Sequence, residues 1–124
     1  MRPTIFTSKL AQIARDTGEP DLHIHIQNAC RHQQAFCFSA DDAVIVLRPR
    51  IKEGVPYVVI WLAISIGLQG LTTYLPTVQH LTRLMGGHWA EFYTVRKGFI
   101  RLARRLGFER QADKRGLMKF KILV

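Results

Sequence analysis

The last third of the chain constrains the fold most, because a strand, a helix and a hairpin follow one another there without a linker. Residues 88–95 are rich in aromatic and β-branched side chains, which is typical of a strand. A basic amphipathic pattern then predicts a helix from Lys97 to Leu106, and Gly107-Phe108 ends it. Two short strands follow, at 108–111 and 117–124. Such a unit indicates a mixed fold in which a helix covers a sheet.

The amino-terminal third predicts two helices after a short strand. We read Arg2–Phe6 as the strand, and Thr7 or Ser8 as the cap of the first helix. Residues 21–33 fit both a helix and a strand, because their apolar positions recur with helical spacing and also alternate. A second helix is favoured, since Asp21 is a good helix cap directly after a proline.

The centre of the chain predicts three strands and a helix. The strands are 35–39, 43–51 and 55–66, separated by polar turns. Trp61 lies in the middle of the longest strand, so we expect it in the core. A helix at 72–85 follows, with Pro76 in its first turn and Gly86-Gly87 at its end.

Length and composition predict one domain. A chain of 124 residues with 48% apolar and 22% charged residues can bury a single core without metal or disulfide staples, so 1–124 is read as one unit. Cys30 and Cys37 are expected as reduced, buried thiols. No apolar signal segment follows Arg2, and the longest apolar run, 55–68, is too short to span a bilayer. We therefore expect a cytoplasmic protein that is not secreted and has no membrane partner.

Positive charge is concentrated near the carboxyl end. The formal net charge is +9, and the stretch 96–121 holds ten Lys or Arg residues against Glu109 and Asp113. Such a surface attracts nucleic acid, nucleotide phosphates or an acidic protein. Within the last predicted helix the outward positions form a partner-binding candidate, because they carry four cations and no carboxylate: Lys97, Arg101, Arg104 and Arg105. No aromatic side chain is interleaved with them, which disfavours recognition of a single strand by this helix.

Three histidines and a cysteine raise the question of a metal site. His23 and His25 would point in nearly opposite directions on a helix, and Cys30 would lie on its apolar face. On a strand the two histidines would share a face, but no further ligand pair follows them. Solvent-facing histidines, His32 included, are the favoured interpretation, and no metal is predicted.

The order of elements resembles that of the GNAT superfamily of N-acetyltransferases. The full order is (β)-α-α-β-β-β-α-β-α-β-β, and "Leu-Gly-Phe" at 106–108 separates the last helix from the final hairpin as in that superfamily. The resemblance implies an α/β (α+β) fold with a GNAT-like mixed sheet. It also implies acetyl-CoA as the cofactor, if the chain retains one.

In GNAT enzymes, the turn after the fourth strand binds the pyrophosphate of acetyl-CoA with Arg or Gln, two residues, Gly, one residue, and Gly or Ala. The equivalent turn here consists of Gly67, Leu68, Gln69, Gly70, Leu71 and Thr72. With Gly70 as the first glycine, Gly67 replaces the Arg or Gln, and with Gly67 as the first glycine, Ile64 replaces it. The remaining Gly-x-x-Gly turn into a helix can hold a phosphate or be only a tight turn.

The last helix of these enzymes carries Asn, Ala and Tyr before "Gly-Phe", and the Tyr protonates the CoA thiolate. The resemblance places Arg96, Phe99 and Ala103 at these positions. Ala103 has no proton to donate, so Tyr93 or Tyr74 would have to replace it. Glu91 is the only carboxylate near the expected cleft, and with Tyr93 it forms the catalytic candidate pair. A solvent-facing strand residue is nevertheless the favoured interpretation of Glu91.

Residues 95–108 look most like the GNAT-like proteins of tailed bacteriophages, including the small internal virion proteins of podoviruses. That resemblance implies a fold kept as a scaffold, with acetyl transfer diminished or lost, and a location in the host cytoplasm or the virion. Two hypotheses follow. One is a degenerate GNAT-fold binding protein that acts through its basic surface on a polyanion, and the other is an active acyl-CoA-dependent N-acyltransferase with an atypical site.

Overall fold

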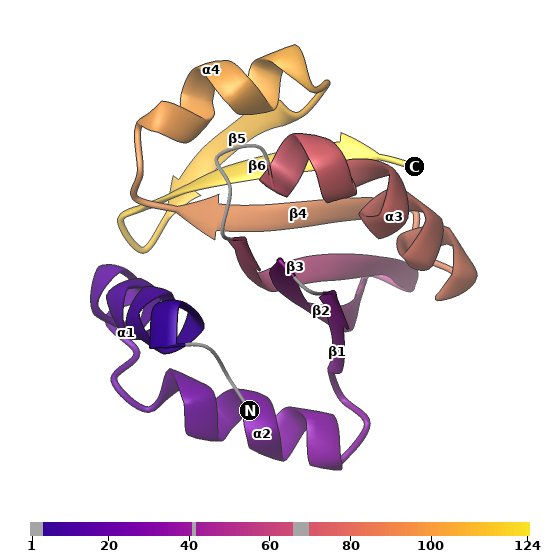
Figure 1. Cartoon of the computed structure of the whole chain (residues 1–124). Helices are drawn as coiled ribbons and strands as arrows, with labels where there is room; N and C mark the ends of the chain where they lie inside the picture. Colours follow the sequence, from indigo (N-terminus) through magenta and orange to yellow (C-terminus); the bar gives the residue numbers. More distant parts are fainter. Residues whose placement is uncertain (1–3, 41, 66–69) are drawn as a thin grey trace.

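The computed structural model describes residues 4–40, 42–65 and 70–124 (Figure 1). These residues form four helices and a six-stranded sheet with the strand order β1-β2-β3-β4-β6-β5. In chain order the elements are α1 (Thr4–Thr17), α2 (Leu22–Arg31), β1 (Phe36–Ala40), β2 (Ala43–Lys52), β3 (Val55–Ser65), α3 (Gly70–Leu84), β4 (Trp89–Thr94), α4 (Gly98–Arg105), β5 (Glu109–Lys114) and β6 (Leu117–Leu123).

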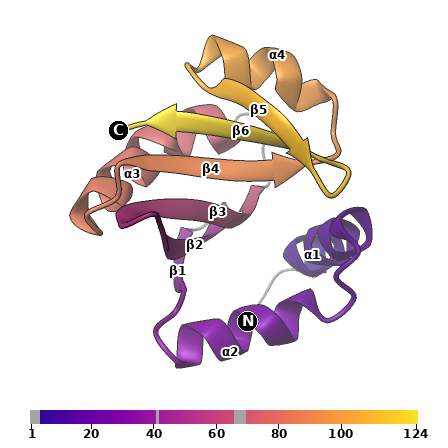
Figure 2. The same ribbon diagram turned by 180° about the vertical axis from the view of Figure 1, so that it is seen from behind.

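The sheet is antiparallel except for its central pair, because the crossover helix α3 makes β3 and β4 parallel. Helices α3 and α4 pack on one face of the sheet, and α1 and α2 lie beside the other (Figures 1 and 2). The mixed α+β class predicted from the sequence is confirmed, and so is the second helix.

The larger core lies between the sheet and helices α3 and α4. Phe92 is at its centre, with its ring 5.7 Å from Phe99, 5.1 Å from Phe108 and 5.2 Å from Phe120. These rings come from α4, from the segment after it and from β6, so one aromatic cluster fixes α4 to the sheet. Gly107 has a φ of +98°, which a residue with a side chain rarely adopts, and it turns the chain from α4 into β5.

The amino terminus differs from its prediction. Residues 4–6 belong to α1 and not to a strand, so Thr7 and Ser8 lie inside the helix and do not cap it. The residues Thr4, Ile5 and Phe6 have strand propensity, but a long helix that places Leu10 and Ile13 against the sheet outweighs that local preference.

Helix α3 begins at Gly70, two residues earlier than predicted, so Pro76 lies inside it and not in its first turn. Pro76 therefore removes one hydrogen bond from the interior of the helix. The prediction was wrong because the threonines at 72–73 resemble caps, whereas the helix has already started before them.

Three side chains are less buried than the sequence predicted. Trp61 is half-buried, and it is the extra residue of a bulge in β3, since Val46 pairs with Leu62 and Leu47 with Ile60. A bulge bends the strand, and the Trp61 side chain packs at the edge of the smaller core beside α1 and α2, with the Arg48 guanidinium 4.4 Å from its ring centroid. Cys30 is half-buried and Cys37 exposed, and both are free thiols.

No helix in the described part of the chain is long and apolar enough to cross a membrane.

Candidate functional site

The opening between β3 and β4 is where this fold offers a crevice. The two strands pair at only two positions, Val58 with Ala90 and Val59 with Glu91. Beyond these positions β3 continues to Ser65 and β4 to Thr94, and each pairs only with its other neighbour, β3 with β2 and β4 with β6. The strands therefore diverge toward their carboxyl ends, which is the side on which sheets with parallel strands bind ligands.

The turn expected to bind pyrophosphate precedes and includes the start of α3. Of its residues, Gly67, Leu68 and Gln69 lie outside the described residues. Gly70, Leu71 and Thr72 form the first turn of α3, where Leu71 packs against the larger core and Thr72 is exposed. A helix amino terminus supplies N–H groups to an anion, but the first turn of α3 has no cationic side chain to support them.

The position that the superfamily uses for its proton donor is closed in this chain. Ala103 is 0% exposed and belongs to the larger core. Phe99 packs its ring on Phe92 and fills the space one turn earlier in α4. The described residues therefore fit acetyl-CoA in part: the diverging strands and the start of α3 are present, while Ala103, which the resemblance aligns with the superfamily's proton donor, has no proton to donate.

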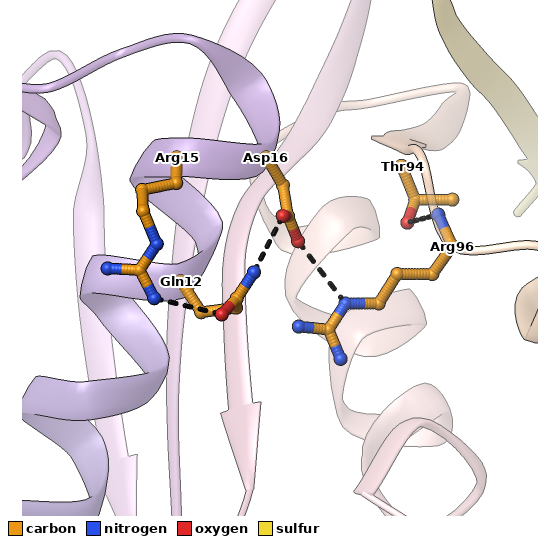
Figure 3. Close-up of polar contacts among 5 residues, drawn as sticks. All are labelled: Gln12, Arg15, Asp16, Thr94 and Arg96. Carbon is orange, nitrogen blue, oxygen red and sulfur yellow. Dashed lines mark hydrogen bonds and ion pairs between the residues drawn. The ribbon is translucent and has the colours of Figure 1, made fainter.

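Arg96, at the position of the superfamily's Asn, connects the strand opening to α1 (Figure 3). Its Nε lies 3.4 Å from Oδ2 of Asp16, and its backbone N–H donates to Oγ1 of Thr94 at 3.1 Å. Asp16 also accepts a hydrogen bond from the Gln12 amide at 2.8 Å, and Gln12 accepts one from Arg15 at 2.9 Å. These contacts join α1 to the junction between β4 and α4. The Arg96 guanidinium therefore already has a carboxylate partner in Asp16.

The carboxylate of Glu91 is buried, with 3% of the residue exposed, so the prediction that it faces solvent is wrong. It accepts hydrogen bonds from the Trp89 indole N–H at 2.8 Å and from the Tyr93 hydroxyl at 2.5 Å. Lys119 on β6 lies 3.7 Å from the same carboxylate. Strand β4 lies inside the sheet, and the long side chains on both sides of Glu91 cover it, which a single-strand pattern does not reveal.

The structure thus brings the two catalytic candidates, Glu91 and Tyr93, into direct contact. Burial, and then the hydrogen bond and negative charge of Glu91, raise the pKa of the Tyr93 hydroxyl. A phenol with a raised pKa is a poor proton donor, and this one already donates to the neighbouring carboxylate. Through Glu91 the pair also contacts the Trp89 indole and the Lys119 ammonium, so it holds these two side chains in position.

A hollow of about 240 Å³ lies beside this pair, and sequence reasoning missed it. The alternation in β6, which places Lys119 and Lys121 on one face, was the available signal. The lining residues come from the end of β2, the turn after it, and from β3, β4, β5 and β6: Lys52, Glu53, Val55, Trp89, Glu91, Gln111, Lys119 and Lys121.

The histidines do not converge. His25 lies 3.8 Å from Glu19, and Nδ1 of His32 contacts the Asn28 carbonyl at 2.8 Å, while His23 is exposed. Within the described ranges, no three His, Cys, Asp or Glu side chains are arranged to hold a metal ion.

Helix α4 presents the cationic face that its sequence predicts. Ala103 is buried on its inner side, whereas Lys97, Arg101, Arg104 and Arg105 are exposed. In the described part of the chain none of these four has a carboxylate within ion-pair distance. We call these four residues the α4 surface.

Solved structures similar to this one share the GNAT fold. An acetyltransferase of the GNAT family from Listeria monocytogenes 4b F2365 matches with a TM-score of 0.68 and 10% identity, over 97% of this chain and 84% of that chain. The PaiA N-acetyltransferase of Thermoplasma acidophilum in complex with coenzyme A has a TM-score of 0.60 and 9% identity, over 100% and 81%. The AtaT–AtaR complex bound to DNA has a TM-score of 0.58 and 14% identity, over 80% and 74%. No protein-family model and no curated protein matches the sequence. The chain therefore has the GNAT fold.

Proposed function

We propose that this chain is a GNAT-fold binding module that has lost acetyl transfer and holds the phosphate backbone of a nucleic-acid duplex on its α4 surface. The observation that carries the proposal is the set of four exposed cations on one short helix without a neighbouring carboxylate. A solvated helix face normally mixes both signs of charge, and uncompensated cations repel one another until an anion binds.

The loss of catalysis is supported by the groups around the strand opening. Ala103 is fully buried where a tyrosine would act, and Arg96 is paired with Asp16. Glu91 and Tyr93 are bonded to each other, and the raised pKa of Tyr93 opposes proton donation. Tyr74, the other candidate proton donor, donates its hydroxyl hydrogen to the carboxylate of Asp42.

A duplex is favoured over an acidic protein because the α4 surface is rigid and carries charge alone. Phe99 and Ala103 anchor the helix in the core, so the backbone that carries the four cations is held in place on the sheet. Cations without aromatic neighbours contact phosphates and read no bases, so binding should be independent of sequence.

The test compares two triple variants with the same change in charge. In the first, Arg101, Arg104 and Arg105 become Glu. In the control, three exposed cations on other elements become Glu: Arg31, Arg83 and Lys114. We expect the α4 variant to lose duplex binding in a fluorescence anisotropy titration, while the control keeps most of the affinity. Equal losses in both variants would show that net charge, and not the α4 surface, determines binding. If the parent binds an acidic protein more tightly than any duplex, the partner of the α4 surface is an acidic protein and not a duplex.

A phage-type role is part of this proposal and rests on the resemblance of residues 95–108 alone. It places the module among virion-associated proteins. Mass spectrometry of purified particles from a source strain tests it, and absence from particles together with presence in the cell extract contradicts it.

A second candidate function is acyl-CoA-dependent N-acyl transfer, favoured by one observation: β3 and β4 diverge after two paired positions, and α3 begins directly beyond the opening. Under the main proposal, calorimetry with acetyl-CoA should give only weak binding. Low-micromolar affinity that disappears in Gly70→Asp, where a carboxylate would repel the pyrophosphate, would favour this second function.

A further inference from the structure

The two faces of the sheet differ in character. Strand β4 directs Ala90 and Phe92 to the face that α3 and α4 cover, and it directs Trp89, Glu91 and Tyr93 to the opposite face. Seen from behind, β4, β6 and β5 lie in front of α3 and α4, with no helix drawn over them (Figure 2). Farther along β3, α1 and α2 cover this same face at Leu62. We call the part that they leave uncovered, formed by β4, β6, β5, residues 55–59 of β3 and the adjoining end of β2, the open sheet face.

Aromatic rings form the centre of the open sheet face. Tyr57 on β3 stacks on Trp89 on β4, with ring centroids 4.7 Å apart and an interplanar angle of 9°. Tyr93 follows two residues after Glu91 on the same side of β4. All three aromatic side chains are half-buried, so each keeps part of its surface accessible to solvent.

Cations flank these rings on both sides. The Lys121 ammonium lies 4.2 Å from the Trp89 ring centroid, and that of Lys119 lies 5.9 Å from the Tyr93 ring. On the other side Arg50 pairs in register with Tyr57, which places both on the same face, and Lys52 lines the hollow. Cation–π contacts hold such ammonium groups beside the rings without neutralising them.

The two carboxylates that line the hollow, Glu53 and Glu91, do not reverse this positive character. Glu53 is exposed in the turn after β2, and Glu91 is compensated by Lys119 and by the donors on Trp89 and Tyr93. Lys52 and Lys121 have no carboxylate within ion-pair distance among the described residues. Both line the hollow of about 240 Å³, which is smaller than the roughly 300 Å³ of the smallest typical drug-sized sites. A hollow of this size has room for one planar ring that carries an anionic group.

We propose that the open sheet face binds single-stranded nucleic acid, with bases against the Tyr57, Trp89 and Tyr93 rings and phosphates on the flanking Lys and Arg side chains. Rings interleaved with cations on an uncovered sheet are what a single strand requires, because every base has a face to stack and every linkage a charge. Glu91 acts as a positioning residue that orients two of the rings and one lysine. This surface lies on the side of the sheet opposite to the α4 surface, so it goes beyond the proposed duplex binding and can fail or hold independently of it.

The experiment follows a labelled single-stranded oligonucleotide by anisotropy and by tryptophan quenching across a salt series. The double variant Lys52→Glu with Lys121→Glu is compared with Lys114→Glu and Arg115→Glu in the β5–β6 turn, which changes the net charge equally. We expect the first variant to bind about tenfold more weakly, with a slope of log K against log salt reduced by about two, while the turn variant stays close to the parent. Because the Lys121 stem packs on Trp89, Arg50→Glu with Lys52→Glu, both exposed, serves as a second variant if the first one unfolds.

The location of the contact between the oligonucleotide and the protein is tested with Trp89→Phe, which keeps a stacking ring and removes one fluorophore. We expect most of the quenching seen in the parent to disappear, and unchanged quenching would contradict the proposal. Equal losses in the Lys52/Lys121 and turn variants, or no binding by the parent at low salt, would also overturn it. If inorganic phosphate or a nucleoside monophosphate displaces the oligonucleotide at equal phosphate concentration, the face binds a small phosphate ligand and not a strand. If poly-glutamate displaces it equally well, the face binds an acidic protein segment.

Discussion

Replacing Glu91 with Ala removes a buried carboxylate that three side chains contact. The Trp89 indole and the Tyr93 hydroxyl each lose a charged acceptor, and Lys119 loses its ion pair. We expect Glu91 to support the structure of the sheet and not to act on a substrate, so its replacement should first lower the stability of the protein.

The expected cost follows from these contacts. Hydrogen bonds to a charged group contribute about 1.5–3 kcal/mol each, and two are lost. The Lys119 side chain is 20% exposed, so water compensates part of its lost pairing. Because contributions of neighbouring contacts are not additive, we expect Glu91→Ala to lower the free energy of unfolding by about 3 kcal/mol. Glu91→Gln keeps one acceptor oxygen in place and should cost about half as much.

Urea denaturation followed by circular dichroism measures these differences, since the midpoint moves while the slope stays constant for a change in stability alone. Glu109→Ala is the matched control, because Glu109 is an exposed carboxylate on the edge strand β5, which β6 separates from β4, and it accepts a hydrogen bond from Gln111 at 3.1 Å. It should change the free energy of unfolding by less than about 0.5 kcal/mol. If Glu91→Ala has no larger effect than this control, the structural role of Glu91 is refuted.

Three further predictions concern the core, pH and the α1 contact. Trp61→Ala should lower the free energy of unfolding by about 1.5–3 kcal/mol, because Trp61 is half-buried and a fully buried aromatic costs roughly 3–5 kcal/mol. A urea midpoint that corresponds to a loss within that range for a fully buried aromatic would contradict its observed burial. Because the folded pKa of Tyr93 is raised above its ordinary value of 10.0, its contribution to stability is complete below about pH 10 and is lost as pH rises further. Tyr93→Phe should therefore flatten the alkaline part of the stability–pH curve, and an unchanged curve would contradict the cause given. Arg96→Ala breaks a pair in which the arginine side chain is 55% exposed, so it should cost only about 0.5 kcal/mol in thermal denaturation, and a loss above about 2 kcal/mol would show a deeper role.

Local patterns predicted the elements whose signals are complete within a short stretch. Helix α4 was predicted to within one residue at each end, because its apolar positions repeat with helical spacing and Gly107 stops it with a positive φ. The turn at Glu53-Gly54 was predicted for a similar reason, since both residues adopt positive φ between β2 and β3.

Features that depend on distant parts of the chain were not predicted. The burial of Glu91 requires β6 to supply Lys119 from the neighbouring strand, and no pattern in β4 encodes that partner. The partial burial of Trp61 depends on a bulge that appears only when β2 and β3 pair. The alternation of Lys119 and Lys121 was visible in the sequence, but which side of the sheet the helices leave open is a tertiary property.

The salt dependence of duplex binding by the parent protein tests the central claim most directly. If the four cations of the α4 surface contact phosphates, log K should fall linearly with log salt with a slope of about −3 to −4, near −0.9 for each contact, and duplexes of unrelated sequence should give the same line. A slope near zero, or no association at low salt, would contradict the claim that this GNAT fold is a polyanion-binding module.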